Sequence, residues 1–143
     1  MQTPTFQIAI DANDPHSLNR FWAAAVGYEI EDHHELIEQV IGAGHASRED
    51  TIEIDGRLAW KNAAACRDPR GNGPRLLFQY VAEPKAVKDR IHLDLEHGFD
   101  DDGRAAEVAR LTELGATKLW DGQQGPYRWV TMADPEGNEF CVV

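Results

Sequence analysis

The sequence is poor in cysteine, in basic residues and in long apolar runs, and each shortage excludes a class of protein. Two cysteines, Cys66 and Cys141, are too few and too far apart for a disulfide framework or a thiolate zinc site. No apolar run reaches the roughly 18 residues of a membrane helix, and the N-terminus lacks the basic start and apolar core of a signal peptide. We therefore expect a cytoplasmic protein without a membrane partner.

Basic residues are outnumbered by acidic ones, 14 to 25, which gives a formal net charge of −11 at pH 7. Binding to a phosphate backbone depends on Lys and Arg, so this balance argues against a nucleic-acid partner. A negative surface can steer cationic small molecules, but the simpler interpretation is that the charge maintains solubility. With 143 residues, 42% hydrophobic and 27% charged, the chain has the size and composition of one globular domain.

The first half of the chain predicts an alternating strand followed by a capped helix. Residues 5–11 alternate between apolar and polar side chains, which is typical of a half-buried strand. Asp14 and Pro15 are suited to the cap and first turn of a helix, and Gly27 is suited to its left-handed end. Further elements are predicted as a short strand at 28–31, an inserted helix within 33–44, and strands at 51–54, 56–62 and 75–81.

The second half predicts the same order of elements. Residues 91–96 alternate as residues 5–11 do. Asp101 or Asp102 is suited to cap a helix that runs through Leu114, and Gly115 then stands where Gly27 stood. Three closing strands are predicted at 116–120, 127–132 and 139–143.

The two halves also match residue by residue. The segment DPRGN at 68–72 corresponds to DPEGN at 134–138, each time before a final strand, and alignment of the first strands places Gln7 opposite His92. This repeat predicts an α+β fold in which two βαβββ modules form a curved mixed sheet around a cleft, with the helices outside. We expect a single domain over 1–143, with module one at about 1–83 and module two at about 84–143. Clefts of this kind usually bind small ligands.

Four segments give the chain a family resemblance. They are MADPEGNEFC at 132–141, EPK at 83–85 leading into RIHLDL at 90–95, LGA at 114–116, and RFW at 20–22. In their order they look like the glyoxalase-like branch of the vicinal oxygen chelate superfamily, which includes glyoxalase I, bleomycin-resistance proteins and extradiol dioxygenases. The resemblance covers nearly the whole chain and implies the paired-module fold and a homodimer. It carries less weight for chemistry, because one such fold supports many functions.

The resemblance implies where a ligand site should lie. Metal-dependent members of the superfamily take ligands from the first and last strands of each half, and the matching positions here are Gln7, Gln79, His92 and Cys141. Cys141 stands where those members carry a glutamate, so His92 is the only conventional ligand left. We therefore expect no metal cofactor, with a softer divalent ion as the alternative. The iron triad of the extradiol dioxygenases is not present at these positions.

His92 and Asp94 share one strand face and form a candidate catalytic acid–base pair. The alternative for His92 is a hydrogen-bonded strand residue, and the alternative for Asp94 is a structural ion pair with arginine. Cys141 is a candidate ligand-binding residue or a small buried apolar side chain.

The aromatic residues Trp60, Tyr80 and Trp129 lie on predicted strands, where they either fill the core or bind a flat ligand. Trp120 is assigned to packing. Two functions follow from these residues and the resemblance. The first is a metal-free protein that binds a small apolar or amphipathic molecule in the cleft, as bleomycin-resistance proteins do by sequestration. The second is a lyase or isomerase of glyoxalase-like type that uses His92 and Asp94 as acid–base groups.

Overall fold

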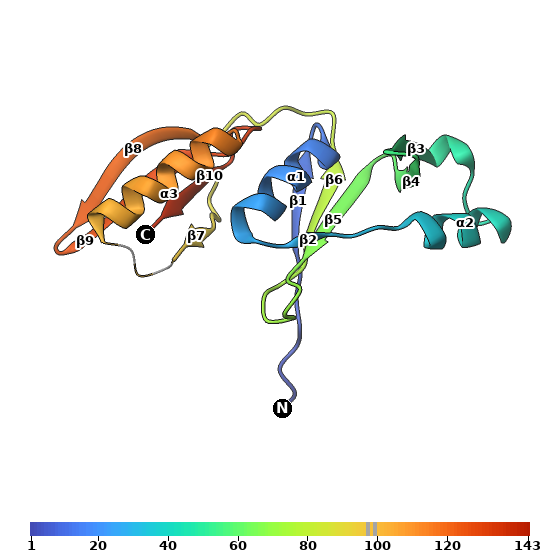
Figure 1. Cartoon of the computed structure of the whole chain (residues 1–143), viewed down its shortest axis with the longest axis horizontal. Helices are drawn as coiled ribbons and strands as arrows, with labels where there is room; N and C mark the ends of the chain where they lie inside the picture. Colours follow the sequence, from blue (N-terminus) through green and yellow to red (C-terminus); the bar gives the residue numbers. More distant parts are fainter. Residues whose placement is uncertain (97, 99) are drawn as a thin grey trace. The chain divides into compact units, whose positions relative to one another are not determined.

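The chain divides into two compact units in the computed structural model, which describes residues 1–96, 98 and 100–143 (Figure 1). The first unit holds residues 1–23 and 27–82, and the second holds residues 24–26 and 83–143. Apart from residues 24–26, the second unit begins at Glu83, and the sequence predicts the second module from about residue 84. Among the described residues, no helix is long and apolar enough to cross a membrane.

The first unit is built on a four-stranded sheet with the strand order β1-β6-β5-β2. The first strand, β1 (Ile8–Ala12), pairs in parallel with the last, β6 (Leu76–Tyr80). The other neighbours are antiparallel, β6 with β5 (Ala63–Arg67) and β5 with β2 (Glu29–Ile30). This is the mixed sheet of a βαβββ module. The predicted start at residue 5 is too early, because Phe6 precedes the β1–β6 ladder and is 73% exposed.

Helix α1 (Pro15–Val26) connects β1 to β2 and has the predicted ends. The Asp14 side chain accepts a hydrogen bond from the Ser17 amide, and Gly27 ends the helix at a φ of 73°. That left-handed conformation favours glycine, which has no Cβ to clash. The apolar side of α1 is buried, with Leu18 1% exposed.

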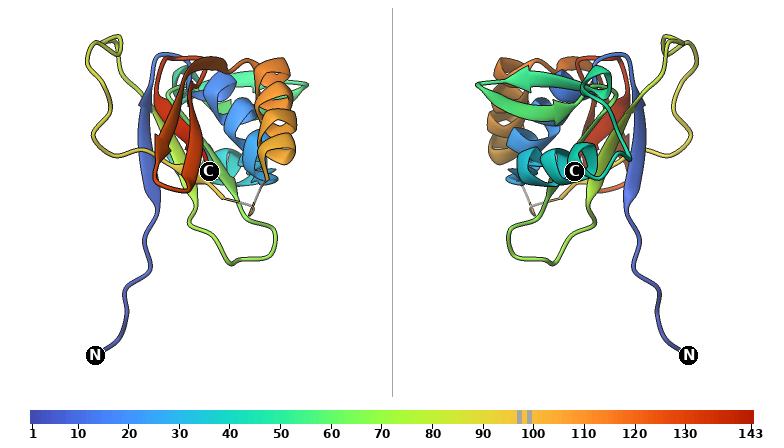
Figure 2. Two further views of the ribbon diagram at one scale, coloured as in Figure 1. Left: turned by 90° about the vertical axis from the view of Figure 1, so that its left-hand side faces the viewer. Right: turned by 90° about the vertical axis from the view of Figure 1, so that its right-hand side faces the viewer.

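An inserted segment between β2 and β5 adds a helix and a hairpin to the first unit. The predicted helix is present as α2 (His34–Gly42), and a short 3₁₀ helix, η1 (Arg48–Asp50), follows it. The hairpin consists of β3 (Thr51–Ile54) and β4 (Arg57–Trp60), which form a separate two-stranded sheet. Helix α2 lies beside this hairpin (Figure 2), and the Leu58 amide donates to His34 Nδ1 at 2.9 Å.

The strands predicted at 51–54 and 56–62 form this hairpin, and the second of them ends at Trp60. The main sheet contains a further strand, β5, with the sequence AAACR, which was not predicted. Alanine has a weak preference for strands, so β5 depends on its ladders to β6 and β2 rather than on local propensity.

The second unit repeats the arrangement of the first. Its sheet has the order β7-β10-β9-β8, which corresponds strand for strand to β1-β6-β5-β2. The elements are β7 (Asp94–Leu95), α3 (Asp101–Leu114), β8 (Thr117–Gln124), β9 (Tyr127–Ala133) and β10 (Glu139–Val142). β7 is parallel to β10, and the other neighbouring pairs are antiparallel. The predicted α+β fold with two βαβββ modules is therefore confirmed.

Several boundaries in the second unit differ from the prediction, and β8 continues to Gln124 rather than ending at residue 120. β7 has two residues rather than six, because β10 meets this segment only near Leu93 and Leu95, and Ile91 is 90% exposed. The cap of α3 is Asp100, whose Oδ1 accepts from the Gly103 amide at 2.7 Å, so it lies before both predicted capping residues.

Each module has the same turn before its last strand. Asp134 Oδ1 accepts hydrogen bonds from the amides of Glu136 at 2.9 Å and Asn138 at 3.0 Å. Asp68 in the first unit accepts in the same way from the Arg70 amide at 2.9 Å, and its side chain also accepts from the Gly73 amide at 3.0 Å. The two aspartates are buried. The repeated motif is therefore an aspartate that organises the turn leading into β6 or β10.

Candidate functional site

The candidate site is a row of side chains that crosses the sheet of the second unit. Strand register pairs Trp120 on β8 with Thr131 on β9, Thr131 with Cys141 on β10, and Cys141 with Asp94 on β7. Paired residues on neighbouring strands point to the same face of a sheet. His92 is two residues before Asp94 and joins the same face, since side chains alternate along an extended chain.

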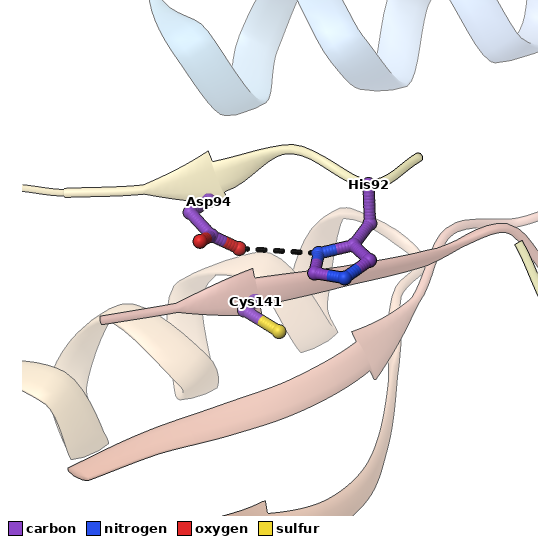
Figure 3. Close-up of side chains that lie close together, drawn as sticks. All are labelled: His92, Asp94 and Cys141. Atoms are coloured by element: carbon purple, nitrogen blue, oxygen red, sulfur yellow. Dashed lines mark hydrogen bonds and ion pairs between the residues drawn. The ribbon is translucent and has the colours of Figure 1, made fainter. Parts of the chain in front are cut away.

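His92, Asp94 and Cys141 come together at one end of this row (Figure 3). His92 Nδ1 lies 3.3 Å from Asp94 Oδ1, and one donor atom from each of the three residues lies within 4.8 Å of the others. The His92 and Asp94 side chains are partly exposed, whereas Cys141 is 8% exposed. The arrangement gives the site an imidazole oriented by a carboxylate, with a thiol beside them.

Cys141 is held in a protonated form. Burial raises the pKa of its thiol, and a nearby Asp94 carboxylate raises it further, while the hydrogen bond with Thr131 opposes both. The Thr131 hydroxyl lies 3.6 Å from Cys141 Sγ. A thiol whose pKa is raised is a weak nucleophile at neutral pH, because the thiolate is the reactive form.

These side chains line a pocket of about 360 Å³. Trp120 and Trp129 form its aromatic wall, and the His92–Asp94 pair, Thr131 and Cys141 form its polar part. Trp120 is 46% exposed, so its assignment to packing is wrong. A pocket with apolar walls and a few polar groups is the usual form of a small-molecule site.

Lys88 and Glu139 also line the pocket, and Glu139 is tied into a small charged cluster. Lys85 Nζ lies 3.0 Å from Glu139 Oε2, and the Asp89 amide donates to the same oxygen at 2.9 Å. Burial alone would raise the pKa of Glu139, but the hydrogen bonds from Asp89 and Lys85 outweigh it and hold the pKa below its ordinary value. Glu139 is therefore an anchored carboxylate rather than a proton donor.

Of the residues predicted for the site, the structure brings together His92, Asp94, Trp129 and Cys141 in this pocket. Trp120, Thr131 and Glu139 line the same pocket and were missed. The sequence could have indicated Thr131, because it lies two residues from Trp129 on an alternating strand and so shares its face. It could not have indicated Trp120, because a bulge between Lys118 and Trp120 shifts the register of β8 against β9.

The remaining predicted residues, Gln7, Trp60, Gln79 and Tyr80, belong to the first unit. Gln7 Oε1 accepts a hydrogen bond from Arg75 at 3.0 Å. Trp60 lies on the inserted hairpin, and Tyr80 is exposed at the end of β6.

Gln79 is not the counterpart of Cys141. Cys141 pairs with Asp94, and Asp94 corresponds to Ala9, which pairs with Leu77. Leu77 therefore occupies the position equivalent to Cys141, and Gln79 lies two residues further along β6.

His92, Asp94 and Cys141 are also a possible ligand set for a metal ion. His92, Asp94 and Cys141 offer one imidazole nitrogen, one carboxylate oxygen and one sulfur. This mixed set suits a borderline ion such as Zn²⁺ better than Mg²⁺ or Mn²⁺, which prefer oxygen ligands, but it offers only three ligands among the described residues and burial keeps its thiol protonated. If Zn²⁺ bound, these three residues would hold it, and the ion would supply a Lewis acid to the pocket.

Comparison with known proteins identifies the family. A family model described as "Glyoxalase-like domain" matches residues 7–143. The chain therefore belongs to the glyoxalase-like domain family. No curated protein matches the sequence.

Solved structures share the fold at low sequence identity. A glyoxalase/bleomycin resistance protein/dioxygenase family enzyme from Burkholderia phytofirmans PsJN is 14% identical, with 95% of this chain and 94% of that chain covered and a TM-score of 0.59. The fosfomycin resistance protein FosX from Mesorhizobium loti is 10% identical, with 99% and 91% covered and a TM-score of 0.60. The bleomycin-binding protein from Streptomyces verticillus is 14% identical, with 100% and 97% covered and a TM-score of 0.55.

Proposed function

We propose that the protein binds a small amphipathic molecule in the pocket of the second unit, without a resident metal. The observation that carries the proposal is the row Trp120–Thr131–Cys141–Asp94, which gives one pocket of about 360 Å³ an aromatic part and a polar part. The two indoles would contact the apolar body of the ligand. His92, Asp94 and Thr131 would hydrogen-bond its polar group.

The family supports this proposal at the level of the fold. One neighbour is a bleomycin-binding protein solved with copper(II)-bleomycin. The size of the present pocket favours a smaller ligand, because about 360 Å³ is at the lower end of the range for ligand pockets.

The binding test uses a panel of one-ring and two-ring aromatic alcohols and amines, followed by amide chemical shifts. We expect some members to shift the amides of β7 to β10 and to lose at least tenfold in affinity in Trp120→Ala. Tyr127→Ala is the control, since it removes an exposed aromatic side chain of the same unit that does not line the pocket. A panel that shifts no amide around this pocket, or binding unchanged in Trp120→Ala, would contradict the proposal.

The absence of a resident metal is tested separately. Elemental analysis of the purified protein is expected to find no stoichiometric Zn, Ni, Fe or Mn. One equivalent of such a metal, lost in His92→Ala, would overturn this part of the proposal and leave the binding pocket standing.

A second candidate function rests on the 3.3 Å contact between His92 Nδ1 and Asp94 Oδ1. A carboxylate that orients an imidazole is a recurrent acid–base arrangement, in which the free Nε2 exchanges a proton with the substrate. An isomerase or lyase reaction would then survive chelator and be lost in both His92→Ala and Asp94→Asn. Turnover that neither substitution affects would exclude this candidate.

The expected homodimer is a separate proposal. Light scattering should give twice the chain mass of 16.0 kDa. A mass equal to one chain would contradict it.

A further inference from the structure

The first unit contains a second pocket, of about 210 Å³, that the proposed function does not use. It lies between α1, the segment that follows β2, the inserted hairpin and β5. Its walls are mostly apolar and include Ile30, Leu58, Ala59, Trp60 and Ala64. The pocket is thus built in large part by the insertion that distinguishes the first module from the second.

Asn19 on α1 lines this pocket and is 2% exposed. Its Nδ2 donates to the Ala65 carbonyl on β5 at 3.1 Å, which fixes the orientation of the amide. Its Oδ1 is buried and has no hydrogen-bond partner among the residues that the structure describes. Buried polar atoms in folded proteins are nearly always paired, so this acceptor is open to a donor that either a water or a bound molecule would supply.

Several other polar groups of the pocket are already engaged. One turn before Asn19, His16 Nε2 lies 2.7 Å from the Trp60 carbonyl, which ties α1 to the hairpin. At the rim, Glu31 contacts Arg75 and His33.

Arg57 at the rim is paired as well, with Asp32 at 2.6 Å and with Glu35 at 2.7 Å. Asp55 also lines the pocket, but its side chain lies exposed at the turn of the hairpin. An ionised ligand would have to compete with these pairs, so the chemistry of the pocket favours a neutral one.

We propose that this pocket binds a small neutral molecule with one ring or a similar apolar body, whose hydroxyl or N–H group donates to Asn19 Oδ1. The size agrees with this class, because an apolar cavity of roughly 150 Å³ accommodates benzene, and about 210 Å³ leaves room for one substituent. This pocket lies in the first unit, whereas the His92 pocket lies in the second. The proposal therefore goes beyond the proposed function and does not depend on it.

Phenol and toluene test the proposal, because they have nearly the same shape and only phenol has a donor. Amide shifts are followed during titration of the full chain with each compound. Phenol should shift the amides around Asn19 and Trp60 and bind roughly fivefold to tenfold more tightly than toluene. In Asn19→Leu this preference should disappear while toluene still binds.

Ala59→Leu provides a second variant that does not alter the buried amide. Ala59 is only partly buried on β4, and a larger side chain there should fill the pocket and abolish binding of both compounds. Equal binding of phenol and toluene to the wild type would overturn the role of Asn19. If neither compound shifts these amides at millimolar concentration, the pocket holds only water and the proposal fails.

Discussion

The indole ring of Trp129 lies directly over Gly122, its partner in the ladder between β8 and β9. A Cβ at position 122 would overlap atoms of the ring. Glycine therefore lets the indole approach the backbone of β8 at the edge of the candidate pocket. The backbone of Gly122 does not require a positive φ, so the constraint at this position is one of space.

Gly122→Ala should displace Trp129. We expect a changed tryptophan fluorescence spectrum, several-fold weaker binding of any ligand of the second unit's pocket, and a loss of about 1–3 kcal/mol in the free energy of unfolding. Gly42→Ala is the control, because a Cβ there meets nothing within 4 Å and helix α2 gains a better helix former. A variant at position 122 with the wild-type spectrum and stability would show that the ring is not held against β8.

The two thiols should react slowly in the folded protein. Burial raises the pKa of Cys66 to about 12 and also raises the pKa of Cys141, so each thiol is protonated at neutral pH. We expect labelling by a thiol reagent to become fast only after unfolding. Cys141 should label before Cys66 as the pH rises, because it lines a pocket and Cys66 is fully buried.

The same labelling experiment reports on the site. A ligand in the second unit's pocket should protect Cys141 and leave Cys66 unchanged. Rapid labelling of Cys141 at pH 7 would mean that the thiol is ionised, which the structure does not predict.

Acid should weaken the first unit through Glu31. The hydrogen bond from Arg75 holds the pKa of Glu31 below its ordinary value, against the effect of burial. A carboxylate with a lowered folded-state pKa stabilises the protein above its unfolded pKa, and this stabilisation is lost as the pH falls through the folded value. The loss therefore begins below about pH 4.5, the ordinary value for glutamate.

Urea unfolding of Glu31→Gln at pH 7 and across the acid range tests this prediction. The variant should be less stable at pH 7, and its stability should depend less on pH below 4.5 than that of the wild type. Glu53→Gln is the charge-matched control, since Glu53 is the exposed residue of β3, and it should follow the wild type. Parallel pH profiles for wild type and Glu31→Gln would refute the linkage.

Asp134→Ala should destabilise the second unit. The change removes the acceptor for the amides of Glu136 and Asn138, and a buried donor left unpaired costs about 1–3 kcal/mol. Because the turn leads into β10, we also expect weaker ligand binding near Cys141. Glu113→Ala on the exposed side of α3 should change neither property.

Features that depend on residues close together in the chain, such as helix ends and strand alternation, are the ones that the sequence predicts best. Asp14 and Gly27 act within their own helix, so the ends of α1 are visible in the sequence. The alternation of His92 and Asp94 is equally local, and it correctly places both on one face. β5 was missed because its alanines carry little strand preference and its pairing partners are remote in sequence.

The errors in the site have the same origin. The loop before the last strand is longer in the first module, at Gly73-Pro74, so sequence matching alone does not fix the counterpart of Cys141, and the ladder aligns Leu77 rather than Gln79 with it. The face on which Trp120 lies could not be predicted by alternation, because the register of β8 is irregular at Leu119. The buried amide of Asn19 depends on the Ala65 carbonyl and on a hairpin that no local pattern connects to α1.

The inserted helix and hairpin also bear on how freely this fold can change. They lie within the stretch of chain that must be closed into a loop before β1 can meet β6. Loop-closure entropy grows only with the logarithm of length, and even a doubling costs only about 0.6 kcal/mol. The module can therefore gain or lose a segment at this point with little penalty to its sheet, which makes the junction between β2 and β5 a natural place for shuffling or engineering new pockets.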